Sequence, residues 1–371
     1  MSHVLLVEPY YGGSHKAWVD GWMATSRHQI GLISHAADFW RWRIRGGPVT
    51  LAEDAAQYVA GHGTPDAVVV SDMVDVAAFA GLSRRTLRTV PIGLYMHENQ
   101  LMYPLGANQQ PDESLSLANW RSMVAADAIW FNSAFQRDGL FAELPRFFNR
   151  QVDHPHTGFI PRIEERSSVL PVGVNTRRLI EAERPVRPAA HGPLVLWNQR
   201  WDHDKNPGAV FRALVKLAED DVPFQLALAG ENQRVDPREF GWVQEQLADR
   251  VVHVGHLPVA EYRQLLLRSD VVVSAAHHEF FGIAIVEAVA AGAVPVLPDR
   301  QSYPEVMPAK FHGAILYPDG ELGQRLRTVL TGLAGAQAQV EGLREQMGIY
   351  DWSVVAPKYD AVIDTLVAAT A

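Results

Sequence analysis

Two pairs of charged residues in the second half of the chain have types and spacings that suit the binding of a phosphorylated sugar. Arg200 and Lys205 lie between a strand-like run and an expected helix. Guanidinium and ammonium groups at such a position can neutralise a diphosphate. Glu279 and Glu287 lie eight residues apart, and carboxylates accept hydrogen bonds from sugar hydroxyls. Each pair alone also fits a structural role, as solvated cations or as a helix cap with one partly buried glutamate.

An expected helix that opens near Gly282 lies between the two glutamates. The backbone N–H groups of Gly282 and Ile283 lie at its start, where the helix dipole favours an anion. We therefore expect the phosphates at this helix start, close to the two cations.

Candidate residues in the first half also follow strand-like runs. Gly12 and Gly13 come after the first run, and glycine permits close approach of the backbone to a ligand. His97 directly follows the apolar run Ile92–Met96 and is succeeded by Glu98 and Asn99. A lone histidine is more often structural, but this polar context favours a functional interpretation of His97.

The histidines give little support for a metal site. His277, His278 and Glu279 are adjacent, and neighbours on an extended segment point in opposite directions, so we expect no zinc there. His15 fits a ligand-binding role and a structural role equally well. The prediction is a site without a metal ion or a cofactor.

The segment Trp40–Arg45 alternates aromatic and cationic residues. An extended conformation would place the aromatic residues on one face and the arginines on the other: Trp40, Trp42 and Ile44 against Arg41, Arg43 and Arg45. Such a segment can stack a base and contact phosphates. A half-buried strand or a helix start with solvated arginines explains the pattern equally well.

Strand-like runs alternate with helical patterns in two successive series, which is typical of doubly wound parallel sheets. The runs of the first series are Val4–Val7, Ile30–Ser34, Ala67–Ser71, Ile92–Met96 and Ala128–Asn132. Those of the second are Leu194–Asn198, Phe224–Ala229, Val251–Val254, Val271–Ser274 and Val294–Pro298. A segment rich in proline and arginine, residues 166–193, separates the two series and indicates a linker.

These patterns predict an α/β fold with two Rossmann-like domains that face each other across a cleft. We place the first domain at residues 1–175, the second at 176–350, and a final helix in 351–371 that packs back on the first domain. Parallel sheets bind ligands beyond the carboxyl ends of their strands. The candidate residues above lie at such ends.

The composition limits the class of protein further. The 371 residues are 47% hydrophobic and include no cysteine, which excludes disulfide scaffolds, zinc–cysteine sites and thiol nucleophiles. The net charge of −9 gives no large attraction to nucleic acid or to an anionic membrane, although a local basic patch is compatible with it. We see no signal peptide or membrane span, and expect a cytoplasmic protein without stable membrane association.

The second half resembles the donor domain of GT-B glycosyltransferases, specifically family 4, whose members are retaining enzymes. The pattern of that family, Arg-x4-Lys followed by two glutamates eight apart, is matched by Arg200, Lys205, Glu279 and Glu287. Further similar segments are Pro171–Asn175, Leu228–Glu231 and Val254–Leu257.

The first half resembles one branch of this family, the tRNA-queuosine alpha-mannosyltransferases. The similarity is carried by Glu8–Lys16, Trp40–Gly46, Met96–Leu101 and Phe131–Ser133. Known members transfer mannose from GDP-mannose to the cyclopentenediol of queuosine in tRNA for aspartate. The resemblance implies the same reaction here, with queuosine-containing tRNA as partner and the nucleotide sugar as co-substrate.

The resemblance also implies a role for each residue. Arg200 and Lys205 would hold the diphosphate with the N–H groups at the helix start, and Glu287 would bind the ribose. Glu279 would bind the transferred sugar, and His97 would contact its 6-hydroxyl. The backbone at Gly12 and Gly13 would approach the donor, while His15, Glu98, Asn99 and the Trp40–Arg45 side chains are acceptor candidates.

Other functions remain open at this point. A lipid or glycan acceptor would keep the chemistry, and Trp18, Trp22 and Trp40 would favour a membrane lipid if they lay on an exposed apolar and basic helix. A nucleotide-sugar epimerase or a glycosyl phosphorylase would share the fold. A non-catalytic sugar-nucleotide binder would not need the full set of charged residues.

Overall fold

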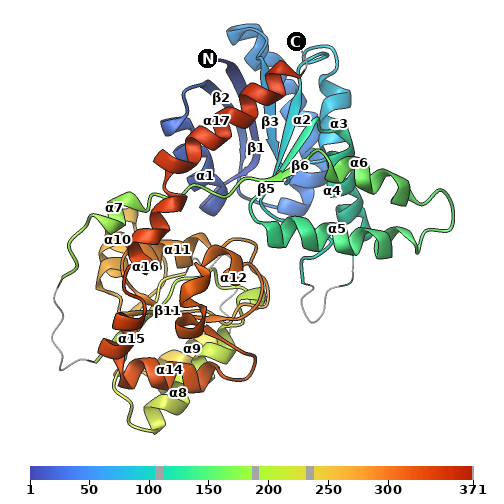
Figure 1. Cartoon of the computed structure of the whole chain (residues 1–371). Helices are drawn as coiled ribbons and strands as arrows, with labels where there is room; N and C mark the ends of the chain where they lie inside the picture. Colours follow the sequence, from blue (N-terminus) through green and yellow to red (C-terminus); the bar gives the residue numbers. More distant parts are fainter. Residues whose placement is uncertain (105–109, 111, 186–191, 231–237, 370–371) are drawn as a thin grey trace. The chain divides into compact units, whose positions relative to one another are not determined.

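The computed structural model describes residues 1–104, 110, 112–185, 192–230 and 238–369 (Figure 1). The chain forms two compact units: residues 1–173 together with 352–371, and residues 174–351. These divisions fall within two residues of those expected from the sequence. Among the described helices, none is long and apolar enough to cross a membrane.

The first unit is built on a parallel sheet of six strands in the order β2-β1-β3-β4-β5-β6. The strands are β1 (His3–Tyr11), β2 (Gln29–Ala36), β3 (Ala67–Ser71), β4 (Ile92–Met96), β5 (Ala128–Phe131) and β6 (Ser167–Val169). All five residues of β3 and of β4 are buried. Continuous apolar runs of this kind form central strands because both faces of a parallel sheet are covered by helices.

The helices of the first unit alternate with these strands. They are α1 (Gly13–Thr25), α2 (Trp40–His62), α3 (Val76–Ser83), α4 (Glu113–Ala125), α5 (Ala134–Phe148), η1 (His156–Phe159), α6 (Ile160–Glu164) and α17 (Trp352–Ala368). Polar N-caps define several starts. Asp75 accepts a hydrogen bond from the N–H of Ala78 before α3, and Ser133 accepts one from Gln136 before α5.

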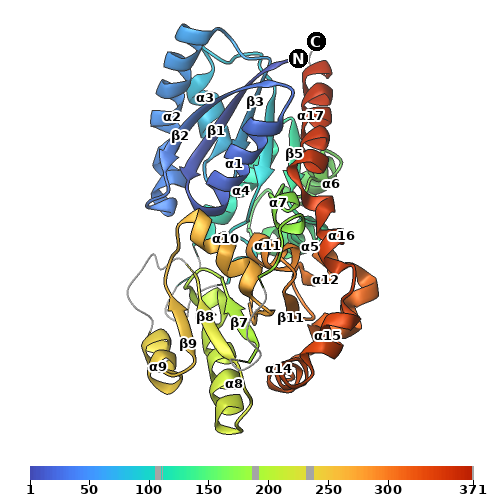
Figure 2. The same cartoon turned by 90° about the vertical axis from the view of Figure 1, so that its left-hand side faces the viewer.

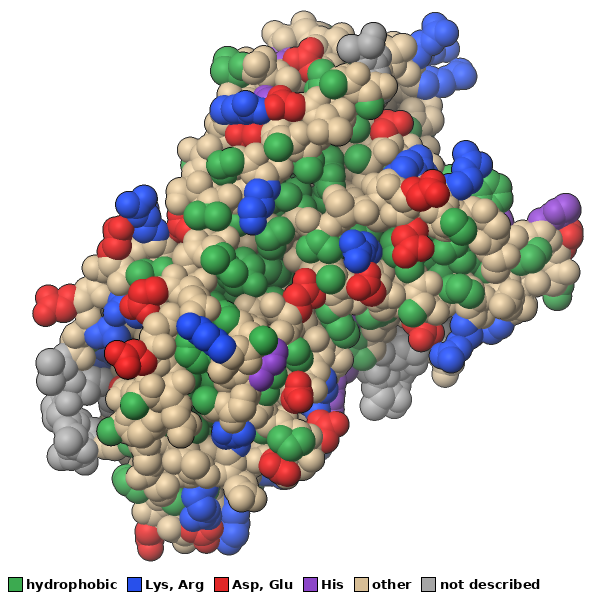
Figure 3. All heavy atoms as spheres, viewed as in Figure 1, with side chains coloured by type: hydrophobic (Ala, Val, Ile, Leu, Met, Phe, Trp, Pro, Cys, Tyr) green, Lys and Arg blue, Asp and Glu red, His purple; other side chains and the backbone are tan. Residues whose placement is uncertain are grey.

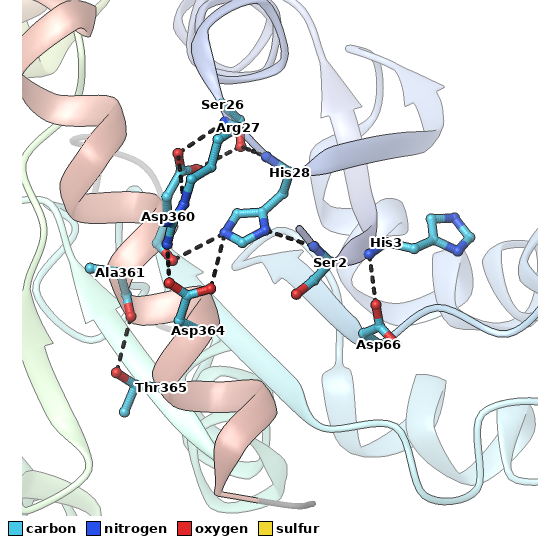
Figure 4. A network of polar contacts seen from close by, with 10 residues as sticks. All are labelled: Ser2, His3, Ser26, Arg27, His28, Asp66, Asp360, Ala361, Asp364 and Thr365. Carbon is cyan, nitrogen blue, oxygen red and sulfur yellow. Dashed lines mark hydrogen bonds and ion pairs between the residues drawn. The ribbon is translucent and has the colours of Figure 1, made fainter.

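The final helix, α17, packs beside α1 (Figures 1 and 2). Trp18 donates a hydrogen bond from its indole N–H to the Tyr359 hydroxyl at 3.0 Å. At the other end of the contact, the Asp360 carboxylate accepts hydrogen bonds from Ser26 Oγ and from the N–H of Arg27, as Figure 4 shows. These buried contacts make the last helix part of the first unit, as the sequence predicts.

The second unit has another six-stranded parallel sheet, in the order β12-β11-β10-β7-β8-β9. The strands are β7 (Leu194–Trp197), β8 (Gln225–Leu228), β9 (Val251–Val254), β10 (Val271–Val273), β11 (Val294–Pro298) and β12 (Leu316–Tyr317). The short β6 and β12 are absent from the sequence prediction, whereas all ten predicted strands are present.

Helices cover this second sheet. They are α7 (Arg177–Ile180), η3 (His203–Lys205), α8 (Pro207–Glu219), α9 (Arg238–Gln246), α10 (Val259–Arg268), α11 (Ile283–Ala290), α12 (Tyr303–Val306), η4 (Ala309–Phe311), α13 (His312–Ile315), α14 (Leu322–Thr331), α15 (Leu333–Gln339), α16 (Leu343–Gln346) and η5 (Met347–Tyr350). In α8 the buried residues Val210, Phe211, Leu214 and Leu217 recur at helical spacing. This periodicity turns one face of the helix toward the sheet.

The linker is shorter than predicted. The segment 166–193 begins with β6 in the first sheet and continues with α7 in the second unit, so its ends belong to the two domains. Residues 186–191, including Pro188, lie outside the described residues. The chain passes between the units at Gly173 and Val174 and returns at Asp351 and Trp352.

Strand order creates one switch point in each sheet. The order changes direction between β1 and β3 in the first unit and between β7 and β10 in the second. Ligands of open parallel sheets bind beyond the strand ends at such points. Glu8 and Asp72 lie at the first switch point, and Asn198 and Ser274 lie at the second.

Candidate functional site

Lys205 is the centre of the charged cluster in the second unit. It ends the short η3 helix, and its side chain is 10% exposed. The ammonium donates a hydrogen bond to the carbonyl of His278 at 2.8 Å and another to Glu279 Oε2 at 3.2 Å. It also lies 3.1 Å from Asp204 Oδ2. The structure therefore brings Lys205 into contact with the segment that carries Glu279.

The charges in this cluster stabilise one another. Burial lowers the pKa of Lys205, but Glu279 and Asp204 outweigh that effect and raise it above its usual value, so the ammonium stays charged. Burial raises the pKa of Asp204, yet Lys205 and Arg200 bring it below its usual value. The half-buried Arg200 thus helps Lys205 to keep the Asp204 carboxylate ionised.

His278 is the neutral member of this cluster. Burial and the neighbouring Lys205 lower its pKa to about 3. Its carbonyl holds the lysine ammonium. The imidazole therefore adds no positive charge to the cluster at neutral pH.

The start of α11 lies beside this cluster. Gly282 is the N-cap and has a φ of 90°, in the left-handed region that glycine adopts without strain. A Cβ at Gly282 would lie 3.4 Å from Glu279 Cγ. This turn brings Glu279 and the first N–H groups of the helix, beginning with Ile283, to one place.

Glu287 lies one turn further along α11 and is half-buried. Its Oε2 accepts a hydrogen bond from the Tyr262 hydroxyl at 3.2 Å. Burial raises the pKa of Glu287 to about 7, although the bond from Tyr262 acts in the opposite direction. Asn198 holds Tyr262 in place beside α11, because its side-chain amide donates hydrogen bonds to the Tyr262 hydroxyl and to the carbonyl of Ala284.

A buried polar network supports the cluster, and the sequence prediction missed it. Ser274 Oγ donates to Gln199 Oε1 at 3.0 Å and lies 2.7 Å from the Tyr303 hydroxyl. Gln199 also donates to Tyr303 at 3.3 Å. These residues fix the ends of β7 and β10 relative to α12. Their positions directly after two buried strands were the available signal.

In the first unit, Glu8 and His15 form a buried pair. Glu8 Oε2 lies 3.1 Å from His15 Nδ1, and its other oxygen accepts hydrogen bonds from the N–H of Tyr10 and from Ser71 Oγ. Burial lowers the pKa of His15, but Glu8, with help from Asp72, outweighs this and raises it to about 9. His15 is therefore an imidazolium at neutral pH.

His97 contacts this pair. Its ring centroid lies 4.1 Å from that of His15, and the Trp18 and Tyr95 rings lie edge-on to it. Burial and the charge on His15 hold the pKa of His97 well below its usual value, so this imidazole is neutral. The backbone N–H of His97 donates a hydrogen bond to Asp72 Oδ1 at 2.8 Å, and this bond fixes the end of β4.

Comparisons with known proteins match both halves of the chain to families. Residues 3–174 match the family described as tRNA-queuosine alpha-mannosyltransferase N-terminal, and residues 180–343 match the family described as glycosyl transferases group 1. The chain is 34% identical over 313 residues to the tRNA-queuosine alpha-mannosyltransferase of Drosophila melanogaster, covering 82% of each protein. The chain belongs to the tRNA-queuosine alpha-mannosyltransferase family.

More distant relatives support the wider assignment as a glycosyltransferase. A glycogen synthase of Mycobacterium tuberculosis is 28% identical over 197 residues, which cover 51% of this chain and 46% of that protein. Among solved structures, the sucrose-phosphate synthase of Thermosynechococcus elongatus covers the full length of both chains with a TM-score of 0.76 at 18% identity. An Anabaena protein in complex with UDP covers 98% of this chain and all of its own, with a TM-score of 0.69 at 15% identity. These structures show the predicted GT-B fold.

The family assignment leaves the roles of individual residues as predictions, and the structure limits some of them. Asn99 is fully buried, and its side-chain oxygen accepts a hydrogen bond from the N–H of Met102. That contact holds the loop together, which is a structural role. Glu98 is half-buried and accepts a hydrogen bond from the Gln100 side chain. Of the two, Glu98 is the better placed to meet an acceptor.

Gly12 and Gly13 are needed by the fold itself. A Cβ at Gly12 would lie 2.3 Å from the Cβ of Ala37, too close for any other residue. Gly13 has a φ of 49° at the first position of α1. The fold therefore requires glycine at both positions, independently of any contact with the donor.

The extended interpretation of Trp40–Arg45 is wrong, because this segment is the first turn and a half of α2. Helical geometry separates the tryptophans from a common face, and Ile44 alone is fully buried. Arg45 pairs with Asp112, and Arg43 reaches the carbonyl of Ala36. Exposed Arg41 lies over the Trp40 ring, and Trp42 is 65% exposed.

Two of the three tryptophans that favoured a lipid acceptor, Trp18 and Trp22, are in the core, whereas Trp40 is half-buried at the start of α2. Trp18 and Trp22 are at most 1% exposed and pack against Tyr359 of α17. They form no exposed apolar and basic helix face. The contribution of Trp18 and Trp22 to the lipid alternative is therefore contradicted.

Two groups of potential metal ligands occur among the described residues, with ligand atoms within 4.8 Å of one another: Glu8, His15 and His97, and Asp202, His203 and Asp204. In the first, His15 Nδ1 lies 3.1 Å from Glu8 Oε2. In the second, His203 Nδ1 contacts the neighbouring Asp202 at 2.8 Å. The expectation of a metal-free site stays a prediction.

Proposed function

We propose that this enzyme transfers mannose from GDP-mannose to the cyclopentenediol of queuosine in tRNA, with retention of the anomeric configuration. The observation that carries the proposal is the identity of 34% over 82% of the chain to the Drosophila tRNA-queuosine alpha-mannosyltransferase. The match of the first unit to the N-terminal family adds to it. A tRNA substrate would place the enzyme in the cytoplasm.

The second unit supplies the groups that a sugar nucleotide requires. Lys205 and Arg200 would neutralise the diphosphate, and the N–H groups at the start of α11 would complete the anion site. Glu287 would accept hydrogen bonds from the ribose hydroxyls. Glu279, held by Lys205 at 3.2 Å, would orient the mannose. Lys205 and Arg200 would stabilise the negative charge on the departing diphosphate in the place of a metal ion.

His97 would assist the reaction without exchanging a proton. Its imidazole is neutral because of burial and the adjacent charge on His15. A neutral imidazole can bind a mannose hydroxyl without adding positive charge beside the oxocarbenium-like transition state. We assign no catalytic base, because in front-face attack a leaving phosphate oxygen can take the proton of the acceptor hydroxyl.

The acidic net charge of −9 leaves room for tRNA only through local contacts. On the face shown in Figure 3, basic side chains are interspersed with acidic ones, and the part of the chain visible there carries no broad basic patch. The exposed arginines of the first unit include Arg84, Arg85 and Arg88. We therefore expect modest electrostatic attraction and selectivity that comes from the modified base.

A transfer assay tests the proposal. Radiolabelled GDP-mannose is incubated with tRNA that carries queuosine and with the same tRNA that carries guanine. Label should appear only on the queuosine-containing tRNA. Hydrolysis of GDP-mannose without transfer would keep the donor and redirect the search to other acceptors, and the absence of both reactions would remove GDP-mannose as the donor.

A further inference from the structure

Three carboxyl groups gather at the switch point of the first sheet. Glu8 belongs to the end of β1, Asp72 follows β3, and Glu98 lies two residues after β4. All three act electrostatically on His15, which is the cation of the group. One imidazolium faces three carboxyl groups, so the cluster has an excess of acid.

Asp72 shows the consequence of this excess. Burial raises its pKa to about 8, and Glu98 and Glu8 act in the same direction against His15. Asp72 is 1% exposed. Its Oδ1 accepts a hydrogen bond from the backbone N–H of His97, while Oδ2 has no hydrogen-bond partner among the described residues. A buried carboxyl oxygen without a partner is unfavourable, and a cationic donor nearby would relieve both the unpaired oxygen and the crowding of acids.

Glu98 is the member of the cluster that a ligand can reach, because it is half-buried whereas Glu8 and Asp72 are fully buried. The loop that carries it is held at several points. Gln100 donates from its N–H to Asn119 and from its side chain to Glu98, and the side chain of Asn132 donates to the carbonyl of His97. A carboxylate on such a fixed loop is preorganised for recognition.

The chemistry of the proposed acceptor matches this cluster. Queuosine joins its cyclopentenediol to the deazaguanine base through a secondary amine, which is protonated at neutral pH. Guanine has no corresponding cation. We propose that Glu98, with Asp72 buried behind it, binds this ammonium group and so distinguishes the modified base from guanine. The inference rests on the proposed function and adds to it a residue pair that selects the acceptor.

The test separates the cation from the diol. Three forms of one tRNA are compared: one with guanine, one with 7-aminomethyl-7-deazaguanine, which has the cation without the diol, and one with queuosine. In the wild-type enzyme the aminomethyl tRNA should compete with queuosine-tRNA about tenfold better than guanine tRNA, as one charge-assisted contact predicts. In Glu98→Gln this preference should disappear while the affinity for guanine tRNA stays the same.

Asp72→Asn gives a second variant that keeps the acceptor for the backbone N–H of His97 and removes the group that can ionise when a cation binds nearby. It should reduce the preference for the aminomethyl tRNA less than Glu98→Gln does. The matched control is Glu143→Gln, an exposed carboxylate on α5 that pairs with Arg146, and it should keep the full preference.

Two results would overturn the proposal. Efficient mannosylation of queuosine-tRNA without any advantage of the aminomethyl tRNA would show that the amine is not recognised, and the proposed function would stand. A preference that survives in Glu98→Gln would assign recognition to other residues. If no tRNA accepts mannose and none binds selectively, the proposed function and this inference both fail.

Discussion

The two switch points differ in the charge that they present. In the second unit Lys205 and Arg200 lie beside the start of α11, and the carboxylates of Asp204 and Glu279 keep the lysine charged. In the first unit the pKa of Asp72 is raised mainly by burial and also by Glu98 and Glu8, against the charge on His15 and the hydrogen bond from the backbone of His97. On the two proposals above, a fold with two similar sheets would have one site for a polyanion and another for hydroxyls and a cation. Substitutions at the two sites should affect different substrates.

The largest expected effect comes from removing the cation of the second site. Lys205→Ala should lower turnover by about 10²–10³, in line with the loss of one preorganised transition-state contact. Its affinity for queuosine-tRNA should remain that of the wild type, because the first unit is untouched. Steady-state kinetics and tRNA binding measured on the same preparation check both statements.

The control for this variant is Lys216→Ala, on the exposed side of α8, where the lysine pairs with Glu219. It should leave turnover unchanged. Thermal unfolding of Lys205→Ala with and without GDP-mannose separates a loss of donor binding from a loss of fold. Near-normal turnover would remove Lys205 from the mechanism and with it the contrast between the two sites.

The second prediction concerns the ion pair of the first site. The pKa of His15 is raised from 6.5 to about 9, so its pairing with Glu8 stabilises the fold fully below pH 6.5 and is lost as the pH rises through 9. The free energy of unfolding should therefore fall by up to about 3 kcal/mol between pH 6.5 and 10. Denaturation at several pH values measures it. In Glu8→Gln this fall should be smaller but not absent, because Asp72, whose pKa is raised to about 8, also titrates in this range. An equal fall in that variant would place the titrating group elsewhere.

The sequence predicted the fold more completely than it predicted the sites. Apolar runs such as Ala67–Ser71 become buried strands because the burial of both faces leaves a visible pattern. Lys205 and Glu279 were found because a family pattern marks them. Asp72, Gln199 and Ser274 were not found, because their importance depends on which strands are neighbours. The spacing of residues does not predict the strand order β2-β1-β3, which brings Glu8 beside Asp72.

The same limit explains the misread segment at Trp40. Alternation of aromatic and cationic residues indicates a strand when it lasts, but this segment continues into the 23-residue helix α2. Phe39, with a φ of 51°, precedes the helix and ends the preceding loop. Tertiary context decided between two local patterns of similar strength.

The third expected effect is a pH dependence of donor binding through Glu287, the residue proposed to bind the ribose. The pKa of Glu287 is raised to about 7 by burial, so this carboxyl group ionises as the pH passes 7. A carboxylate accepts stronger hydrogen bonds than a neutral carboxyl group, so the affinity for GDP-mannose should increase roughly tenfold between pH 6 and 8. Glu287→Gln should bind with an affinity that does not change over this range. Calorimetry without tRNA measures it, since the diphosphate of GDP-mannose does not titrate there.

A donor that lacks the ribose hydroxyls provides the control for Glu287. The 2′,3′-dideoxy form of GDP-mannose should bind wild-type enzyme more weakly and with little dependence on pH. A steep dependence in this ligand would assign the titration to another group of the second unit.

The smallest expected effect concerns the tRNA backbone near the start of α2. Arg45 is already paired with Asp112, whereas Arg41 is exposed on the Trp40 ring. Arg41→Ala should therefore weaken tRNA binding about twofold to threefold and reduce the slope of log K against log salt by roughly 0.7–0.9, the contribution of one phosphate contact. Arg146→Ala, an exposed arginine of α5 that pairs with Glu143, is the control and should keep the slope. Guanine and queuosine tRNA should lose affinity equally in Arg41→Ala, because a phosphate contact carries no information about the base. A loss confined to queuosine-tRNA would instead show that this helix start helps to recognise the modified base. The acceptor site would then extend from the acidic switch point to the start of α2.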